Sequence, residues 1–349
     1  MKKKRIFLAV VCALLLLVLV IMPAVTVLVY ESVFGVRYTT AKWIENSIED
    51  YPDMKMERSD FMSGGVALAG YKYSSGTDAK GVVVMAHGLG GGGHNAYMSF
   101  AYSFTQSGYY VFAYDVCGND NSEGGSVQGL PRGIMDLDNA ICHVKTVEEY
   151  KGLPIVLFGH SWGAYSAGSV LNIHPEVSAA VLVAGFDRSE DLILYQGKQM
   201  VGPFAYLLLP YVSVYERIKF GGKYTDITAT AGMEKCGAVT VVHSKDDNTV
   251  PAEYGYCKFF ERFEGTEGFD FILYENSGHE MLLYSEEALE YRKLSNEEYH
   301  TYVENNGGEY SVEMREQFAE LYLNKALYFQ PSLELMARII GTYDKFCGK

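Results

Sequence analysis

The longest apolar stretch of the chain lies near its N-terminus. Residues 6–29 contain no charged side chain, and a basic cluster at residues 2–5 precedes them. About 20 apolar residues are enough to cross a bilayer as a helix. We therefore expect an uncleaved transmembrane anchor over residues 1–30. Basic residues remain on the cytoplasmic side, so we expect the rest of the chain to be extracytoplasmic.

A cleaved signal peptide is the alternative interpretation of this segment. Its apolar region is usually about 7–15 residues long and ends at a small-x-small site. The nearest such site is Pro23-Ala24, and Met22 occupies a position where a small residue is expected. Cleavage there predicts a secreted protein instead of an anchored one.

Beyond the anchor, the hydrophobic pattern changes to short apolar runs alternating with amphipathic stretches. Residues 31–60 read as a juxtamembrane connector with a helix over 40–48, and residues 61–349 as one large domain. The β-branched and aromatic runs predict strands, and apolar positions at helical spacing predict helices. We expect strands at 66–73, 81–86, 109–114, 155–160, 177–184, 238–243 and 269–274, and helices at 95–107, 132–150, 286–308 and 333–346.

One insertion is too long for a simple connection between strands. Residues 187–235, called the cap here, have a strongly apolar and aromatic centre at 204–215. Ligand sites are mostly apolar, so the cap is interpreted either as a lid that lines an acyl pocket or as helices that only pack on the body. Insertion of the cap into the membrane is a third hypothesis.

The strand at 155–160 runs directly into Gly159-His160-Ser161-Trp162-Gly163, and a helix can start there. This is the Gly-x-Ser-x-Gly nucleophile elbow in the strand–turn–helix context that it requires. Glycines let strand and helix approach closely around a strained serine. The pattern predicts Ser161 as a nucleophile, with the N–H of Trp162 directed at a developing oxyanion.

The elbow also predicts an acid and then a histidine later in the chain. Asp246 and Asp247 follow the strand at 238–243, and His279 follows the strand at 269–274. Catalytic groups in an open α/β sheet gather on loops at the carboxyl ends of strands. His279 is therefore the expected base, and either aspartate can be the acid on this reasoning.

Five ordered motifs over about residues 60–285 resemble the α/β-hydrolase superfamily, in particular its monoacylglycerol-lipase-like and S33 serine-aminopeptidase-like branch. The motifs are His87-Gly88-Leu89 after a strand, Tyr114-Asp115 with Ser122-Glu123-Gly124, the elbow, Asp247-Asn-Thr-Val-Pro251, and Ser277-Gly-His279. The resemblance implies an α/β fold with a mostly parallel eight-stranded sheet and helices on both faces.

The resemblance also assigns roles by position. Ser161 resembles the nucleophile, His279 the base, and Asp247, which two residues separate from Val250-Pro251, the acid. Asp246 is then a loop charge or helix cap. The N–H groups of Leu89 and Trp162 resemble the oxyanion hole. The motif from Asp115 departs from the family pattern, with Cys117 in place of Arg and Asp120 in place of Gly, which leaves the packing of that loop open.

The net charge and the cysteine spacing argue against some classes of function. After the basic cluster, 25 basic and 43 acidic residues give a net charge of −18, which argues against nucleic acid as a partner. The six cysteines show no Cys-x-x-Cys spacing, so no metal is indicated, and the chemistry implies no cofactor. We expect a membrane-anchored serine hydrolase acting on a small-molecule carboxylic ester. A serine peptidase, with Asp187, Glu190 or Asp191 binding the substrate amine, and a non-catalytic binding module are the alternatives.

Overall fold

The computed structural model describes residues 2–76, 78–90 and 92–347. Its centre is an eight-stranded sheet in the order β1-β4-β6-β5-β7-β8-β9-β10, and β2 and β3 form a separate hairpin. Pairs from β6 to β10 are parallel, whereas β1–β4 and β4–β6 are antiparallel. The strands are β1 Lys55–Arg58, β2 Phe61–Ser63, β3 Val66–Leu68, β4 Gly70–Ser74, β5 Val82–Ala86, β6 Tyr110–Tyr114, β7 Ile155–His160, β8 Ala179–Val183, β9 Val239–Ser244 and β10 Phe269–Tyr274.

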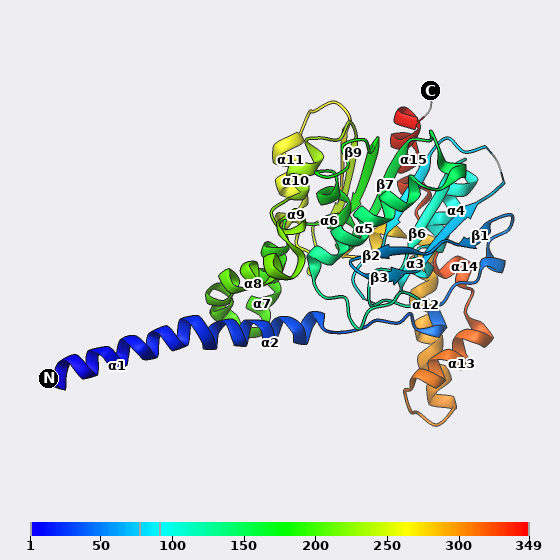
Figure 1. The fold of residues 1–349 in the computed structure, drawn as a ribbon. Helices are drawn as coiled ribbons and strands as arrows, with labels where there is room; N and C mark the ends of the chain where they lie inside the picture. The colour runs from blue at the N-terminus through cyan, green and yellow to red at the C-terminus, as the bar shows by residue number, and fades with distance from the viewer. Residues whose placement is uncertain (1, 77, 91, 348–349) are drawn as a thin grey trace.

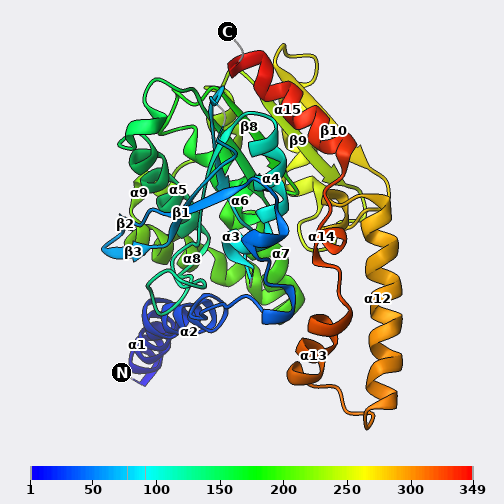
Figure 2. The same cartoon turned by 90° about the vertical axis from the view of Figure 1, so that its right-hand side faces the viewer.

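Helices cover both faces of the sheet (Figures 1 and 2). Alternate residues of β5 belong to two separate cores, Val82 and Val84 to one, and Val83 and Met85 to the other. The helices are α1 Lys2–Leu16, α2 Met22–Phe34, α3 Gly93–Ala96, α4 Met98–Gln106, α5 Leu130–Val144, α6 Trp162–Val170, α7 Ser189–Val201, α8 Ala205–Phe220, α9 Gly222–Thr225, α10 Ala229–Met233, α11 Tyr256–Phe263, α12 Glu286–Asn305, α13 Val312–Tyr322, α14 Lys325–Tyr328 and α15 Leu333–Cys347. The expected fold, a mostly parallel eight-stranded sheet between helical layers, is confirmed.

The N-terminal apolar run forms one helical rod that extends away from the body (Figure 1). Residues Lys2–Phe34 have a window of mean hydropathy 3.2 in which no residue is buried. Residues Leu17–Ile21 form a π-helical turn just before Pro23. Proline lacks the N–H that would bond four residues back, and such a break favours a local π-bulge. The helix is long and apolar enough to cross a membrane.

Several of the expected elements differ from those in the structure. The helix expected at 95–107 is divided at Tyr97 into α3 and α4. Residues 40–48 do not form a helix but two short 3-10 turns, Lys42–Ile44 and Ile48–Asp50. The expected strand at 66–73 is divided into β3 and β4, because the N–H of Ala69 bonds to Ser122 Oγ instead of a neighbouring strand. The helix expected at 132–150 is α5, which begins two residues earlier, at Leu130, and ends at Val144.

The cap residues 187–235 fold into α7 to α10 between β8 and β9. Figure 1 shows α7 and α8 beside α2, well away from α15. The acidic stretch after residue 285 forms α12, and α13 packs on it through a small cluster of Tyr299, Val303 and Phe318. α15 then packs on the sheet through Leu335, Ile339 and Tyr343, as its apolar spacing predicts.

Candidate functional site

The elbow residue Ser161 lies between the end of β7 and the start of α6. Its φ of 56° lies in the left-handed region, which is rare for a residue with a Cβ. A Cβ on Gly159 would come within 2.3 Å of the carbonyl oxygen of Gly163, and one on Gly163 within 2.0 Å of that of Ala86. The strained, tightly packed turn expected from the motif is therefore present.

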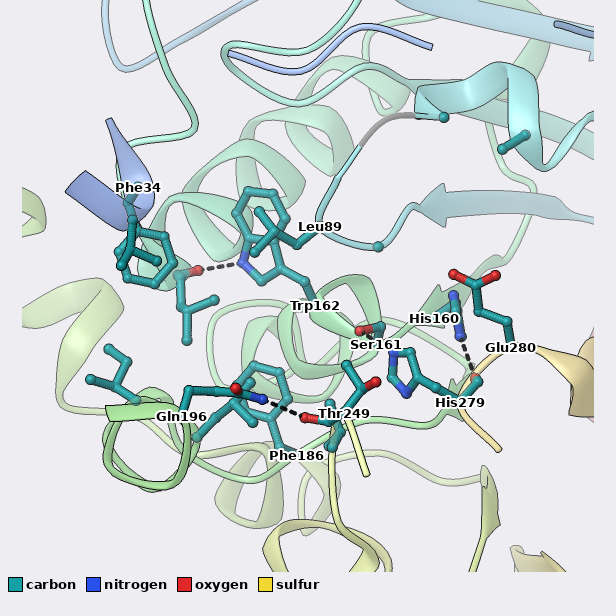
Figure 3. A pocket seen from close by; sticks show the side chains of 18 of the residues that line it. Phe34, Leu89, His160, Ser161, Trp162, Phe186, Gln196, Thr249, His279 and Glu280 are labelled. Atoms are coloured by element: carbon teal, nitrogen blue, oxygen red, sulfur yellow. Dashed lines mark hydrogen bonds between the residues drawn. The ribbon is translucent and has the colours of Figure 1, made fainter. Parts of the chain in front are cut away.

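Ser161, His279 and Asp247 form a continuous line of contacts. Ser161 Oγ lies 2.8 Å from His279 Nε2, and His279 Nδ1 lies 2.7 Å from Asp247 Oδ2. The side chains of Ser161 and His279 lie next to one another at the cavity in Figure 3. When the proton of the imidazole is on Nδ1, the lone pair of Nε2 faces the serine hydroxyl. In this arrangement the histidine can remove the hydroxyl proton of Ser161.

Asp247 is held in its ionised form by its surroundings. Burial alone would raise its pKa, but hydrogen bonds from His279 and from the N–H of Val250 lower it below the ordinary value. Oδ1 accepts from the N–H groups of both Thr249 and Val250 at 2.9 Å. The buried carboxylate is thus held in a fixed orientation against Nδ1 of the adjacent imidazole.

The second aspartate, Asp246, has a different environment. It is exposed, and its Oδ1 accepts from Ser244 Oγ at 2.6 Å and from the N–H of Gly278 at 2.9 Å. These bonds lower the pKa of its carboxyl. The structure therefore brings Asp247 to the histidine, whereas Asp246 fastens the loop that carries His279 to the end of β9.

The two N–H groups expected at an oxyanion hole come from opposite sides of Ser161. Leu89 follows β5, and Trp162 is the first residue of α6. Both residues line the same cavity as Ser161. Within the described residues, neither N–H has a hydrogen-bond partner in the protein, so both remain available to an incoming oxygen.

A hydrogen-bonded network behind the elbow was not expected from the sequence. The Tyr97 hydroxyl accepts from the N–H of Gly88 at 3.2 Å and lies 2.7 Å from His160 Nδ1. His160 Nε2 lies 3.1 Å from the carbonyl oxygen of His279. Burial and the neighbouring His279 lower the pKa of His160 to about 3, so its imidazole is neutral. Through these hydrogen bonds it links the loops that carry Gly88, Ser161 and His279.

The cavity above Ser161 has a volume of about 750 Å³. Its wall comes from four parts of the chain: the body, the cap, the last turns of α2, and the connector through Trp43 and Ile44. Most wall side chains are apolar or aromatic, and Glu280 and Arg292 are the charged ones among the described residues. This composition suits a largely apolar ligand with one reactive polar group.

Two further groups of polar residues lie outside this cavity. Asp187 accepts from the N–H of Thr230, Glu190 accepts from the Ser213 hydroxyl, and Asp191 pairs with Lys258 at 2.6 Å, so the acids considered for amine binding are engaged elsewhere. Asp138, Cys142 and His174 have possible metal-binding atoms within 4.8 Å of one another. The ammonium group of Lys223 already occupies the carboxylate of Asp138, which disfavours a second cation there.

Known proteins resemble this chain in its fold and in the elbow region. The model of the family "Serine aminopeptidase, S33" matches residues 77–236. Caffeoylshikimate esterase from Arabidopsis thaliana is 33% identical over 91 residues, which are 25% of this chain and 26% of that protein. The match thus spans about a quarter of the curated relative.

Two crystal forms of an esterase from Pyrococcus furiosus superimpose on the chain with TM-scores of 0.53 and 0.54 at 16% identity. They cover 77% and 83% of this chain, and 96% and 99% of the esterase. The chain has the α/β-hydrolase fold.

Within this α/β-hydrolase fold, the loop after β6 that departs from the family pattern is held by the connector. Asp120 accepts from the backbone N–H and the hydroxyl of Thr40. Arg37 donates to the carbonyl oxygens of Asp120, Ser122 and Gly124. Cys117, in the place of the family arginine, is buried, and burial raises the pKa of its thiol to about 11. The loop is therefore a structural support beside the cavity.

Proposed function

We propose that this α/β-hydrolase is a membrane-anchored serine hydrolase that cleaves carboxylic esters through an acyl-serine intermediate. The observation that carries the proposal is the contact line from Ser161 Oγ through His279 to Asp247, placed in a mostly apolar cavity. The anchor in this proposal is the helix Lys2–Phe34.

In the proposed mechanism, His279 Nε2 takes the proton of Ser161 as Oγ attacks the ester carbonyl carbon. The N–H groups of Leu89 and Trp162 donate to the negative oxygen of the tetrahedral intermediate. The ester C–O bond then breaks, and the imidazolium returns its proton to the leaving alcohol. Water repeats the same steps on the acyl-serine and releases the acid, while Asp247 stabilises the imidazolium in both halves.

An ester is preferred to a peptide because of the charges around the cavity. The acids that a substrate amine would need, Asp187, Glu190 and Asp191, are absent from the cavity wall, and the wall carries the cation of Arg292. The wall also contains Glu280, and the family matched over residues 77–236 is one of aminopeptidases. A peptidase therefore remains the alternative, and it requires Glu280 to bind the amine.

Labelling with a fluorophosphonate probe tests the nucleophile. We expect the folded wild type to be labelled and Ser161→Ala to remain unlabelled, because only an activated serine attacks the phosphorus. Ser166→Ala, a change in the same helix outside the cavity wall, is the matched control and keeps the label. Equal labelling of wild type and Ser161→Ala contradicts Ser161 as the nucleophile, and an unlabelled wild type contradicts the proposal and favours a binding module.

A panel of p-nitrophenyl acyl esters and aminoacyl amides tests the substrate class. We expect turnover of the esters at rates well above those of the amides. Amide turnover without ester turnover, abolished by Glu280→Gln, selects the peptidase instead.

A further inference from the structure

The anchor helix contributes directly to the wall of the cavity that contains Ser161. Thr26, Val29, Tyr30, Val33 and Phe34 all line it. Their spacing of three or four residues places them on one face of α2. In Figure 3, Phe34 lies on the far side of Trp162 from His279, within the same cavity. A helix that only tethered the body would not need to complete this wall.

The cap supplies the opposite wall and is fastened to the anchor. The Tyr30 hydroxyl donates to Glu216 Oε1 at 2.8 Å, and Tyr215 donates to Glu31 Oε1 at 2.6 Å. Lys219 also pairs with Glu31. These contacts join the last turns of the two helices, and Figure 1 shows α8 lying along α2 on the side away from the body, so α2 and α8 run side by side in the same direction.

This pairing sets the depth of the cap relative to the anchor. Leu207 precedes Glu216 by nine residues, which is roughly 14 Å along a helix. It therefore lies about that far below Tyr30, toward the N-terminal end of the span. One leaflet has a hydrocarbon thickness of about 15 Å, so the tip of the cap fits within the leaflet on the side of the body.

The tip has the surface that this depth requires. Large apolar or aromatic side chains around the turn between α7 and α8, and along the outer side of α8, are exposed: Met200 60%, Phe204 68%, Tyr206 55%, Leu207 57%, Val214 58% and Ile218 78%. Such a contiguous apolar surface marks an interaction site. Lys198 lies 5.5 Å from the ring of Tyr206, and a lysine stem near an interface can extend its charge to the headgroups.

The cavity reaches this same surface. Met200 and Leu208 at the tip line it together with Thr26 of the anchor and Ser161 in the body. We infer that the cavity opens sideways into the outer leaflet between α2 and the cap. The substrate is then a lipid ester resident in the bilayer, with its acyl chain lying between α2 and α8. This substrate assignment rests on the proposed function.

Phosphatidylcholine proteoliposomes containing the full chain provide the activity test. Two rates are compared. The first is the rate of hydrolysis of monoolein in the bilayer, and the second is the rate of hydrolysis of p-nitrophenyl butyrate in water. In a Phe204→Asp/Leu207→Asp variant we expect the ratio of the first rate to the second to fall at least about tenfold, because two charges replace leaflet-facing apolar groups. Neither residue lines the cavity.

The matched control is Leu321→Asp, an exposed leucine on α13 at the other end of the molecule, and its ratio stays that of the wild type. An unchanged ratio in the cap variant, or an equal fall in the control, overturns the inference. A wild type that hydrolyses neither ester overturns the proposed function, and the substrate assignment with it.

Membrane contact is measured separately, without activity. Phe204→Trp adds a fluorophore at the tip to the two native tryptophans. We expect brominated phosphatidylcholine to quench the added emission, taken as the difference from the wild type. Emission that brominated lipid leaves unquenched places the tip in water and overturns the leaflet opening, whether or not the chain is a hydrolase.

Discussion

Two adjacent aspartates follow β9, and they have different hydrogen-bond partners. Asp247 lies 2.7 Å from His279, whereas Asp246 bonds to Ser244 and to the backbone of Gly278. An amide in place of Asp247 would favour the wrong imidazole tautomer and would leave the imidazolium without its counter-charge. We expect Asp247→Asn to lower kcat on the order of a thousandfold or more.

Asp246→Asn is the matched control for this prediction, since it keeps an oxygen for both of its bonds. We expect kcat for it within about tenfold of wild type. The measurement is kcat for p-nitrophenyl butyrate, together with a circular dichroism spectrum to show that both variants are folded. Equal losses in the two variants would show that the acid was assigned wrongly.

For individual residues, the sequence predicted the role correctly where that role depends on a pattern of neighbouring residues. The elbow is local, because glycines and a strained serine must be adjacent, and the positive φ of Ser161 agrees with it. The connection from Gly88 through Tyr97 to His160 was missed. A buried histidine within the elbow needs a hydrogen-bond partner, but nothing in the spacing of the chain identifies Tyr97, which is 63 residues away, as that partner.

At the scale of elements, the most consequential contact is the pairing of α2 with α8. Its centre is Glu216, which accepts from Tyr30 and from Ser189. Burial, with a smaller contribution from nearby Glu190, raises the pKa of Glu216 to about 7, although the two hydrogen bonds and Lys219 act to lower it. The protonated form is therefore favoured in the folded state over a range where an exposed glutamate is already ionised.

The sign of the pH effect follows from this shift. Between the ordinary pKa of glutamate and about 7, the folded state binds more protons at Glu216 than the unfolded state, so its contribution to stability decreases as the pH rises. We expect Tm in detergent micelles to fall more between pH 5 and pH 8 for the wild type than for Glu216→Gln. Buried His87 and His160, whose pKa values are lowered by burial, act in the opposite direction in both proteins. If the difference in Tm between wild type and variant is the same at every pH, Glu216 is not the source of the pH dependence.

Elements with strong local periodicity were predicted well, and those that depend on tertiary contacts were not. α15 and the parallel strands match their apolar patterns. A helix was predicted over residues 40–48 of the connector, but Asn46 exchanges hydrogen bonds with Asn95 and holds the backbone in an irregular path. The pairing of α2 with α8 joins residues 186 positions apart, and an amphipathic pattern identifies an apolar face without identifying its partner.

At the scale of the whole molecule, charge and shape agree on an orientation. The four basic residues at positions 2–5 lie at one end of the long apolar helix, and the acidic body lies at the other end (Figure 1). Basic residues remain cytoplasmic, and the cap beside α2 then faces the outer leaflet. The inferred lateral opening and the topology depend on each other, because the same surface would face the inner leaflet if the chain were inserted in reverse.

Two exposed cysteines on the body, Cys142 and Cys257, allow this orientation to be measured. We expect a membrane-impermeant maleimide to label them in intact cells as fully as after permeabilisation, because the proposed topology places the body outside. A Cys142→Ser/Cys257→Ser variant controls for the other thiols, among which Cys12 lies within the apolar span. Labelling that requires permeabilisation reverses the topology, and labelled protein free in the medium with a new N-terminus near residue 25 shows a cleaved signal peptide. In either case α2 could not deliver a lipid from the outer leaflet to Ser161.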